Sequence, residues 1–349
     1  MKLHQNDVLI MSKILVTGGS GFIGTNVVEH YHVHGHDVIS VDISEPRHPG
    51  HRVLWRNLDV TDAGSLAALI DEFRPEFVFH FAARTDLNGR DLSGYLVNTI
   101  GVANLICGVR RCVPKKIVFA STMLVCSLGH QSRDASDYSP PNIYGQSKVI
   151  AERYIRAIPT NELPWIIVRP TSIWGPWFGV PYRDFFDVVR RGYYIHPANR
   201  VIRRTFGFVG NTVFQLDQLI RADASKTLGC TFYLGDYEPT EIRHWAELIR
   251  TEFGLPPIKC APVVLMKSAA IVCDVMQKIG IRSALLTTRR LRNLLTDAVY
   301  DLGNLQAICG DLPFDLEMSV RLTVAWLREK QAAEQDSTKE MSRATVKPQ

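Results

Sequence analysis

The chain has 349 residues, enough to bury a sizeable core and to form two domains or one large domain with lobes. Hydrophobic residues make up 46% and charged residues 21%, which is ordinary for a soluble globular enzyme. The net charge of +5 comes without a dense basic run interleaved with aromatics, so we expect no nucleic-acid partner. Seven scattered cysteines without a CxxC pair favour reduced thiols and a cytoplasmic location over disulfides or zinc.

No segment of the sequence predicts export or membrane insertion. Residues 1–10 are polar, unlike a signal peptide, and charged residues interrupt the longest apolar stretch, residues 261–281. That stretch predicts an amphipathic helix and no integral membrane segment, although a peripheral membrane contact stays open. The polar residues 331–349 predict a flexible tail.

The first motif is a glycine-rich turn between a short apolar strand at residues 14–16 and a helical pattern from Phe22 onward. Gly18 permits the tight turn, Gly21 lets the backbone approach a pyrophosphate, and Gly24 lets the helix pack closely on the strand. The positive end of that helix would then hold phosphates. This context predicts a dinucleotide site, and the alternative is a glycine turn without a ligand.

The second strand of the same unit, residues 38–41, ends in Asp42. Asp42 follows the glycines by about 20 residues, where a carboxylate can accept hydrogen bonds from the adenosine ribose hydroxyls. A carboxylate there repels a 2′-phosphate, so the sequence favours NAD over NADP.

Strand and helix patterns alternate through the first half of the chain, which is typical of an α/β doubly wound parallel sheet. We expect strands at residues 14–16, 38–41, 53–55, 77–80, 116–120 and 165–169, and helices at residues 22–34, 63–73, 95–110 and 144–157. Beyond Pro170 the rhythm changes, and a smaller C-terminal α/β lobe is expected. We predict a Rossmann domain over residues 1–175 with residues 203–225 returning to it, and a substrate lobe over residues 176–202 and 226–330.

The second motif places Tyr144 and Lys148 four residues apart on one face of a predicted helix. A phenol normally titrates near pH ~10, and a nearby ammonium together with a positive nicotinamide lowers that pKa. About 22 residues earlier, Ser121 and Thr122 follow a strand and offer a hydroxyl to the reacting oxygen. A tyrosine, a lysine and a Ser/Thr hydroxyl together predict hydride transfer, in which Tyr144 moves the proton and Lys148 also binds the nicotinamide ribose.

The sequence resembles the extended short-chain dehydrogenases/reductases, which include the NAD-dependent sugar-nucleotide epimerases and dehydratases. The resemblance covers residues 13–211 well and the remaining lobe loosely. It rests on the following segments: Thr17–Gly24 (TGGSGFIG), Leu58–Asp62 (LDVTD), His80–Ala83 (HFAA), Asn98–Asn104 (NTIGVAN), Tyr144–Lys148 (YGQSK), Arg169–Pro176 (RPTSIWGP) and Arg204–Val209 (RTFGFV).

The resemblance assigns roles to further residues. It implies that Asn98 supports the active-site lysine or a water chain. It also implies that the substrate is bound by Thr122, Tyr144, Ser172 and Arg204. Among these, Arg204 would contact a diphosphate of the substrate. The residues expected to bind NAD are Gly18, Gly21, Phe22, Ile23, Gly24, Asp42, Asp59, Val60, Phe81, Ala82, Ala83, Tyr144, Lys148 and Pro170. It also implies a homodimer formed through the helices at residues 95–110 and 144–157.

Two departures from the family pattern narrow the chemistry. Met123 and Leu124 stand where the 4,6-dehydratases of the family carry an Asp-Glu pair and the related decarboxylases keep a Glu. Neither side chain can transfer a proton, so dehydration and decarboxylation are not expected. Oxidation and reduction of the substrate remain as the expected reactions.

The sequence therefore predicts an NAD-dependent epimerase of a nucleotide-activated sugar that works through a transient ketone. The alternative is a net oxidoreductase, either a 4-keto-sugar-nucleotide reductase or a 3β-hydroxysteroid-type dehydrogenase, whose branch the later segments from residue 286 resemble. A non-catalytic NAD sensor is a third hypothesis, but the retained Tyr144 and Lys148 disfavour it. No metal is expected, because the histidines at positions 30, 32, 34 and 36 have no second ligand group beside them.

Overall fold

The computed structural model describes residues 11–130, 132–278 and 287–345. The predictions for residues 1–10 and for the last three residues of the 261–281 stretch lie outside these ranges. The chain forms two compact units. The first consists of Met1–Ile173, Val209–Tyr237 and Tyr300–Pro313, and the second of Trp174–Phe208, Glu238–Val299 and Phe314–Gln349.

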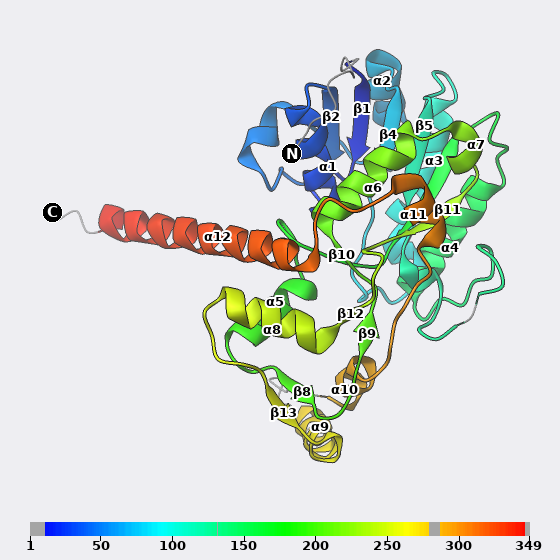
Figure 1. Cartoon of the computed structure of the whole chain (residues 1–349). Helices are drawn as coiled ribbons and strands as arrows, with labels where there is room; N and C mark the ends of the chain where they lie inside the picture. The colour runs from blue at the N-terminus through cyan, green and yellow to red at the C-terminus, as the bar shows by residue number, and fades with distance from the viewer. Residues whose placement is uncertain (1–10, 131, 279–286, 346–349) are drawn as a thin grey trace. The chain divides into compact units, whose positions relative to one another are not determined.

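The first unit is built on a seven-stranded sheet, which confirms the predicted fold class (Figure 1). Its strand order is β11-β6-β5-β4-β1-β2-β3, and neighbouring strands pair in parallel. The strands are β1 (Lys13–Thr17), β2 (Asp37–Asp42), β3 (Trp55–Asn57), β4 (Phe77–His80), β5 (Lys116–Ala120), β6 (Trp165–Pro170) and β11 (Thr231–Leu234). The strand order reverses between β4 and β1, and this is the point at which open α/β sheets bind ligands.

Helices cover both faces of this sheet because successive strand residues point to opposite sides. Ile14 and Val16 join one hydrophobic core and Leu15 joins the other. The first core takes side chains from α1 (Phe22–Val33), α6 (Val209–Arg221) and α11 (Gly303–Cys309). The second takes side chains from α2 (Ala63–Phe73), α3 (Leu96–Val109) and α4 (Ile143–Arg156).

Two boundaries in the first half differ slightly from the sequence prediction. Pro49–Val53 forms the 3-10 helix η1, so β3 begins at Trp55 and not at Val53. Pro49 occupies the first turn of η1, where its fixed φ favours a helical start. Leu92–Tyr95 forms a second 3-10 helix, η2, so α3 begins one residue later than expected.

The two units of the structure differ from the predicted domains in three later segments. Residues 203–208, which were expected to return to the Rossmann domain, belong to the second unit. β11 pairs in parallel with β6, and α11 packs into the core beside α6, so residues 226–237 and 300–313 belong to the first unit. Residues 300–313 follow a stretch of the second unit, and β11 pairs with a strand that lies far earlier in the chain. Neither arrangement leaves a local sequence signal.

The second unit is mostly helical. It contains α5 (Tyr182–Arg190), α8 (Ile242–Glu252), α9 (Val263–Lys278), α10 (Thr288–Leu294) and α12 (Leu316–Thr345), with the short strands β8 (Ile195–Pro197), β9 (Arg203–Arg204), β10 (Phe206–Phe208), β12 (Thr240–Glu241) and β13 (Lys259–Ala261). The backbone stays helical to Thr345, so the predicted flexible tail is a helix for most of its length. Residues 331–345 contain no Gly or Pro, which favours a helix there.

One helical stretch in the described residues, Leu92–Val109, is long and apolar enough to cross a membrane. Val102, Leu105, Ile106 and Val109 of this stretch are buried in the second core of the sheet. Packing within the protein accounts for these four apolar residues.

Candidate active site

The turn between β1 and α1 is shaped by its lack of side chains. Gly18 has φ +74°, and a Cβ there would lie 2.5 Å from the backbone of Phe81 and Ala82. A Cβ on Gly24 would lie 2.1 Å from the Gly18 carbonyl oxygen, so only glycine permits this approach of helix to turn. Gly21 caps α1 without a side-chain hydrogen bond, and the first turn of α1 holds no acid. These features fit a bound pyrophosphate at the helix start.

Asp42 lies at the end of β2 beside the same turn. Its carboxylate accepts hydrogen bonds from Ser20 N (3.1 Å) and Ser44 N (2.9 Å), which tie the turn to the loop after β2. Burial raises the pKa of Asp42, and these backbone bonds act in the opposite direction. The position is the one at which a carboxylate meets the adenosine ribose in dinucleotide-binding folds.

The start of α1 and the segment after β4 hold three more of the residues expected at the cofactor. Phe22 and Ile23 form the first turn of α1, and both are half-buried. Ala83 is half-buried in the segment that follows β4. Partial exposure beside the glycine turn suits the predicted contact with a ligand.

Of the other residues expected at the cofactor, Phe81, Ala82 and Asp59 are placed where they could contact a ligand, whereas the side chain of Val60 is not. Phe81 and Ala82 lie against Gly18 at the end of β4, where the expected passage of the cofactor would bring them close to it. Asp59 is exposed, and its carboxylate accepts from Thr61 N at 2.8 Å. The Val60 side chain is different, because it is buried in the second core and faces inward. Any contribution of Val60 to a cofactor must come from its backbone.

Tyr144 stands in the first turn of α4, which begins where the Asn142 side chain accepts a hydrogen bond from Gly145 N at 2.8 Å. A Cβ on Gly145 would lie 2.2 Å from the Leu124 carbonyl oxygen, so this glycine lets α4 approach the segment that carries Thr122. Burial raises the pKa of Tyr144 to about 12, and a hydrogen bond from Thr122 acts against this rise. The structure brings Tyr144 and Thr122 together as predicted.

Lys148 follows one turn later and is buried. Its Nζ donates to the Ala120 carbonyl oxygen at 2.9 Å, which holds the ammonium at the carboxyl end of β5. Burial lowers the pKa of Lys148 to about 8, although the charge of Glu152 raises it. The expected lowering of the Tyr144 pKa by Lys148 is not seen in the protein alone, where burial dominates the pKa of both groups.

Thr122 begins a short 3-10 helix, η3 (Met123–Val125), and its hydroxyl accepts from Leu124 N at 3.2 Å. This bond leaves the hydroxyl proton for another partner. Met123 and Leu124 are half-buried beside it and offer no proton donor or acceptor. Tyr144, Lys148 and Thr122 thus supply a phenol, an ammonium and a hydroxyl, and Met123 and Leu124 add no acid or base beside them.

Asn98 is fully buried in α3, and its side chain bonds to Arg84 and Ser147. Its side chain accepts from Arg84 N (2.8 Å) and donates to Arg84 O (3.0 Å) and Ser147 Oγ (2.9 Å). Ser147 in turn donates to the Tyr144 carbonyl oxygen at 2.7 Å. These three bonds of the amide are made without Lys148, and Asn98 links the loop after β4 to the helix that carries Tyr144.

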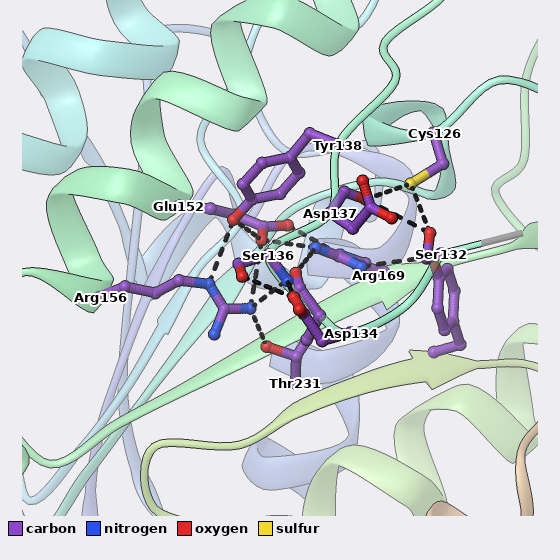
Figure 2. A network of polar contacts seen from close by, with 12 residues as sticks. Cys126, Ser132, Asp134, Ser136, Asp137, Tyr138, Glu152, Arg156, Arg169 and Thr231 are labelled. Carbon is purple, nitrogen blue, oxygen red and sulfur yellow. Dashed lines mark hydrogen bonds and ion pairs between the residues drawn. The ribbon is translucent and has the colours of Figure 1, made fainter. Parts of the chain in front are cut away.

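Behind the site lies a buried ion pair, which Figure 2 shows with its neighbours. Glu152, one turn beyond Lys148, accepts from Arg169 Nε (2.9 Å) and Nη2 (2.7 Å), and both side chains are 1% exposed. Tyr138 donates to Glu152 at 2.9 Å, and Arg156 donates at 3.4 Å. Burial raises the pKa of Glu152, but the bonds and charge of Arg169 outweigh burial and hold it below its usual range.

The three remaining predicted residues come from later segments of the chain. Pro170 ends β6, and Ser172 is buried two residues later in β7 (Ser172–Trp174). Arg204 belongs to the second unit, where its guanidinium donates to the backbone carbonyl oxygens of Asn293 and Thr296. Nη2, one of the three nitrogens of the guanidinium, makes both of these bonds.

Sequence reasoning overlooked two buried polar groups beside the site. His80 ends β4, and its Nδ1 lies 2.7 Å from Thr17 Oγ1, while burial lowers the pKa of His80 to about 3. Glu152 continues the four-residue spacing of Tyr144 and Lys148, which was a usable signal. Arg169 was noticed only as part of a turn, although its partner is this carboxylate.

The chain matches the sequence model of the NAD dependent epimerase/dehydratase family over residues 14–222. The match spans more than half of the chain, and the sheet and glycine turn described above agree with it. The chain belongs to this family, and NAD is the family's cofactor, as the sequence predicted.

Curated relatives include both steroid and sugar-nucleotide enzymes. A 3 beta-hydroxysteroid dehydrogenase/Delta 5-->4-isomerase of Mycobacterium tuberculosis is 29% identical over 70% of each chain. The 3-beta-hydroxysteroid dehydrogenase of Mycolicibacterium neoaurum is 24% identical over 87% of each chain. The dTDP-L-rhamnose 4-epimerase of Burkholderia thailandensis is 26% identical over 47% of this chain and 58% of its own.

Solved structures of similar fold include the UDP-glucose 4-epimerase of Thermotoga maritima, determined with UDP-glucose. It has a TM-score of 0.70 at 21% identity and covers 91% of this chain and 99% of its own. The UDP-glucose 4-epimerase of Thermus thermophilus, determined with NAD, has a TM-score of 0.66 at 22% identity and covers 90% of this chain and 99% of its own. These likenesses show the fold.

Proposed function

We propose that the protein is an NAD-dependent epimerase that acts on a nucleotide-activated sugar through a transient ketone. The observation that carries this proposal is the buried contact of Tyr144 with Thr122, next to Lys148 and beside two apolar side chains, Met123 and Leu124. The cluster can transfer one proton while a secondary alcohol is oxidised, but it lacks the extra acid and base that elimination requires.

NAD supplies a hydride acceptor when it is bound, and the glycine turn with Asp42 is the part of the chain that would hold it. Thr122 orients the substrate hydroxyl, and Tyr144 takes its proton as the carbon is oxidised and returns it when the ketone is reduced. Lys148 would bind the nicotinamide ribose, but its charge does not lower the pKa of Tyr144 in the protein alone, where burial raises that pKa to about 12. A phenol with that pKa is a poor base at neutral pH, so we expect the oxidative half-reaction to need the positive charge of the bound oxidised nicotinamide.

The test is a product analysis on the purified protein with uridine, guanosine and thymidine diphosphate sugars. An epimerase retains NAD tightly through purification and converts one sugar into its epimer without net formation of reduced NAD. Substrate turnover with stoichiometric reduction or oxidation of NAD would contradict the epimerase proposal. Failure of Tyr144→Phe to slow either reaction would contradict the site itself.

A second candidate is a net dehydrogenase of a lipophilic secondary alcohol such as a 3β-hydroxysteroid. Two observations favour it: the steroid dehydrogenases match 70% and 87% of this chain, and Arg204 is bonded to backbone carbonyls. The same Tyr144, Lys148 and Thr122 would perform this reaction. Reduction of NAD by a hydroxysteroid, in place of epimerisation of a sugar nucleotide, would identify it.

We also propose a cytoplasmic homodimer formed through α3 and α4. Leu96 and Ile100 on α3 and Tyr154 on α4 are large hydrophobic residues exposed by 41–52%, which supports a contact there. Light scattering tests the proposal, since Ile100→Glu would then shift the protein toward the monomer. A wild-type monomer would contradict it.

A further inference from the structure

A small cavity lies between β4, β5, β6 and α4, next to the buried lysine. It is lined by His80, Phe119, Ala120, Ser121, Lys148, Glu152 and four apolar side chains. Its volume of about 10 Å³ is close to the smallest that accommodates one water molecule. A site that holds a water also needs polar partners, and this cavity has them.

Two polar atoms of the cavity wall have no hydrogen-bond partner of standard geometry among the described residues. They are Nε2 of His80 and Oγ of Ser121, and both residues are more than nine-tenths buried. A buried polar group without a hydrogen bond is costly, so a bonded partner is strongly favoured at both atoms. Ser121 also helps to lower the pKa of Glu152, which places its hydroxyl close to that carboxylate.

The charged groups at the cavity are one turn apart on α4. Lys148 Nζ uses one of its three hydrogens on Ala120 O, so it keeps donors for a further partner. Glu152 is fixed from the opposite side by Arg169, Tyr138 and Arg156. Lys148 and Glu152 do not form a direct ion pair in the described part of the chain, where Glu152 pairs with Arg156 and Arg169.

We propose that this cavity binds one ordered water that links Lys148 to Glu152, with Ser121 and His80 as its other partners, and that Glu152 is a positioning residue for the lysine. The inference rests on the function proposed for Lys148. The water extends the negative field of the carboxylate to the ammonium, and Arg169 keeps the carboxylate ionised. The lysine thereby retains its charge at a depth where burial favours the neutral amine.

The groups that face Lys148 and Glu152 come from every element packed against them. They are His80 on β4, Ser121 after β5, Tyr138 in the loop before α4, Tyr144 and Arg156 on α4, Arg169 on β6 and Tyr233 on β11, which accepts from Arg169 Nη1 at 3.3 Å. Glu152 is the only acid among them.

The experiment is a titration of Lys148 by NMR in the NAD-loaded full chain, with carbon-13 at the lysine ε position and with Lys148→Arg for assignment. Glu152→Gln should lower the pKa of Lys148 by about one unit or more. Ser121→Ala removes a cavity partner and the Ser121 contact with Glu152 but leaves both Arg169 bonds to that carboxylate, and it should lower the lysine pKa by a smaller amount. Tyr138→Phe is the matched control, because it removes a bond to Glu152 but no charge and no cavity partner, and it should leave the lysine pKa unchanged.

A crystal structure supplies the second readout, with density for one water within hydrogen-bond distance of Lys148 and Glu152. An unshifted lysine pKa in Ser121→Ala, or a cavity without that density, would overturn the proposal even if Glu152→Gln fails to fold. Neither readout needs a substrate. If no sugar nucleotide or steroid turns over, the proposed function fails while the water site can still stand.

Discussion

The glycine turn after β1 and the helix α4 use opposite means to prepare the same end of the sheet. At the turn the chain excludes side chains, so that backbone meets backbone at Gly18, Ala82 and Gly24. On α4 the chain buries charged and polar side chains in series, at Tyr144, Lys148 and Glu152. The glycine turn is a steric site, which tolerates no added side-chain atoms. The helix α4 carries an electrostatic site, which tolerates changes of side-chain shape better than changes of charge.

The largest effect is expected on the electrostatic side. Tyr144→Phe removes the group that transfers the proton, so the turnover number should fall by roughly 10²–10⁴-fold. The hydroxyl is the only group lost, so the thermal midpoint and the amount of bound NAD should change little. A variant with wild-type turnover would separate α4 from the chemistry altogether.

A strong effect on stability is expected on the steric side. Gly24→Ala places a Cβ 2.1 Å from the Gly18 carbonyl oxygen, so the turn must shift, at a cost of about 3 kcal/mol in the free energy of unfolding and with loss of NAD. Gly64→Ala in α2 is the matched control, because its Cβ meets only Asp62 Oδ1 at 3.5 Å. There alanine should stabilise the protein by about 0.5–1 kcal/mol, measured by urea unfolding.

Asn98→Ala tests the link between the two regions. The change removes three hydrogen bonds and leaves the Ser147 hydroxyl and the backbone of Arg84 short of partners in the interior. We expect a loss of about 2 kcal/mol in unfolding free energy and a lower turnover number because α4 is less well held. Asn98→Asp should restore the bond from Arg84 N but lose both donated bonds. Unchanged unfolding in Asn98→Ala would show that the amide does not fix α4.

The smallest effect concerns the pH dependence of stability at His80. Its pKa is about 3 in the folded chain and near ~6.5 when unfolded, so the unfolded chain binds the extra proton between these values. The stability from the neutral ring is fully present above pH ~6.5 and should fall by about 2 kcal/mol on going to pH ~5. Comparing wild type with His80→Gln by urea unfolding at both pH values isolates this loss. His32→Gln, at an exposed position, should keep the wild-type slope.

Local sequence patterns predicted the core of the first unit well, because its strands and helices alternate with clear glycine and apolar signals. Asp42, Tyr144 and Thr122 could be placed from the motifs alone. The inward orientation of Val60, the bonds of Arg204 and the partner of Arg169 could not, because each depends on what a distant segment contributes. The same holds for β11, whose place beside β6 is decided by tertiary pairing.

The chain passes from one unit to the other at five places, after Ile173, Phe208, Tyr237, Val299 and Pro313. A fragment cut after residue 222, where the family match ends, would expose the edge of β6 and lose the side chains that α11 adds to the first core. An expression plasmid limited to the dinucleotide-binding segment is therefore expected to yield aggregates, since an uncovered parallel strand invites pairing with another chain. Deletions made for crystallography should instead be confined to the far end of α12.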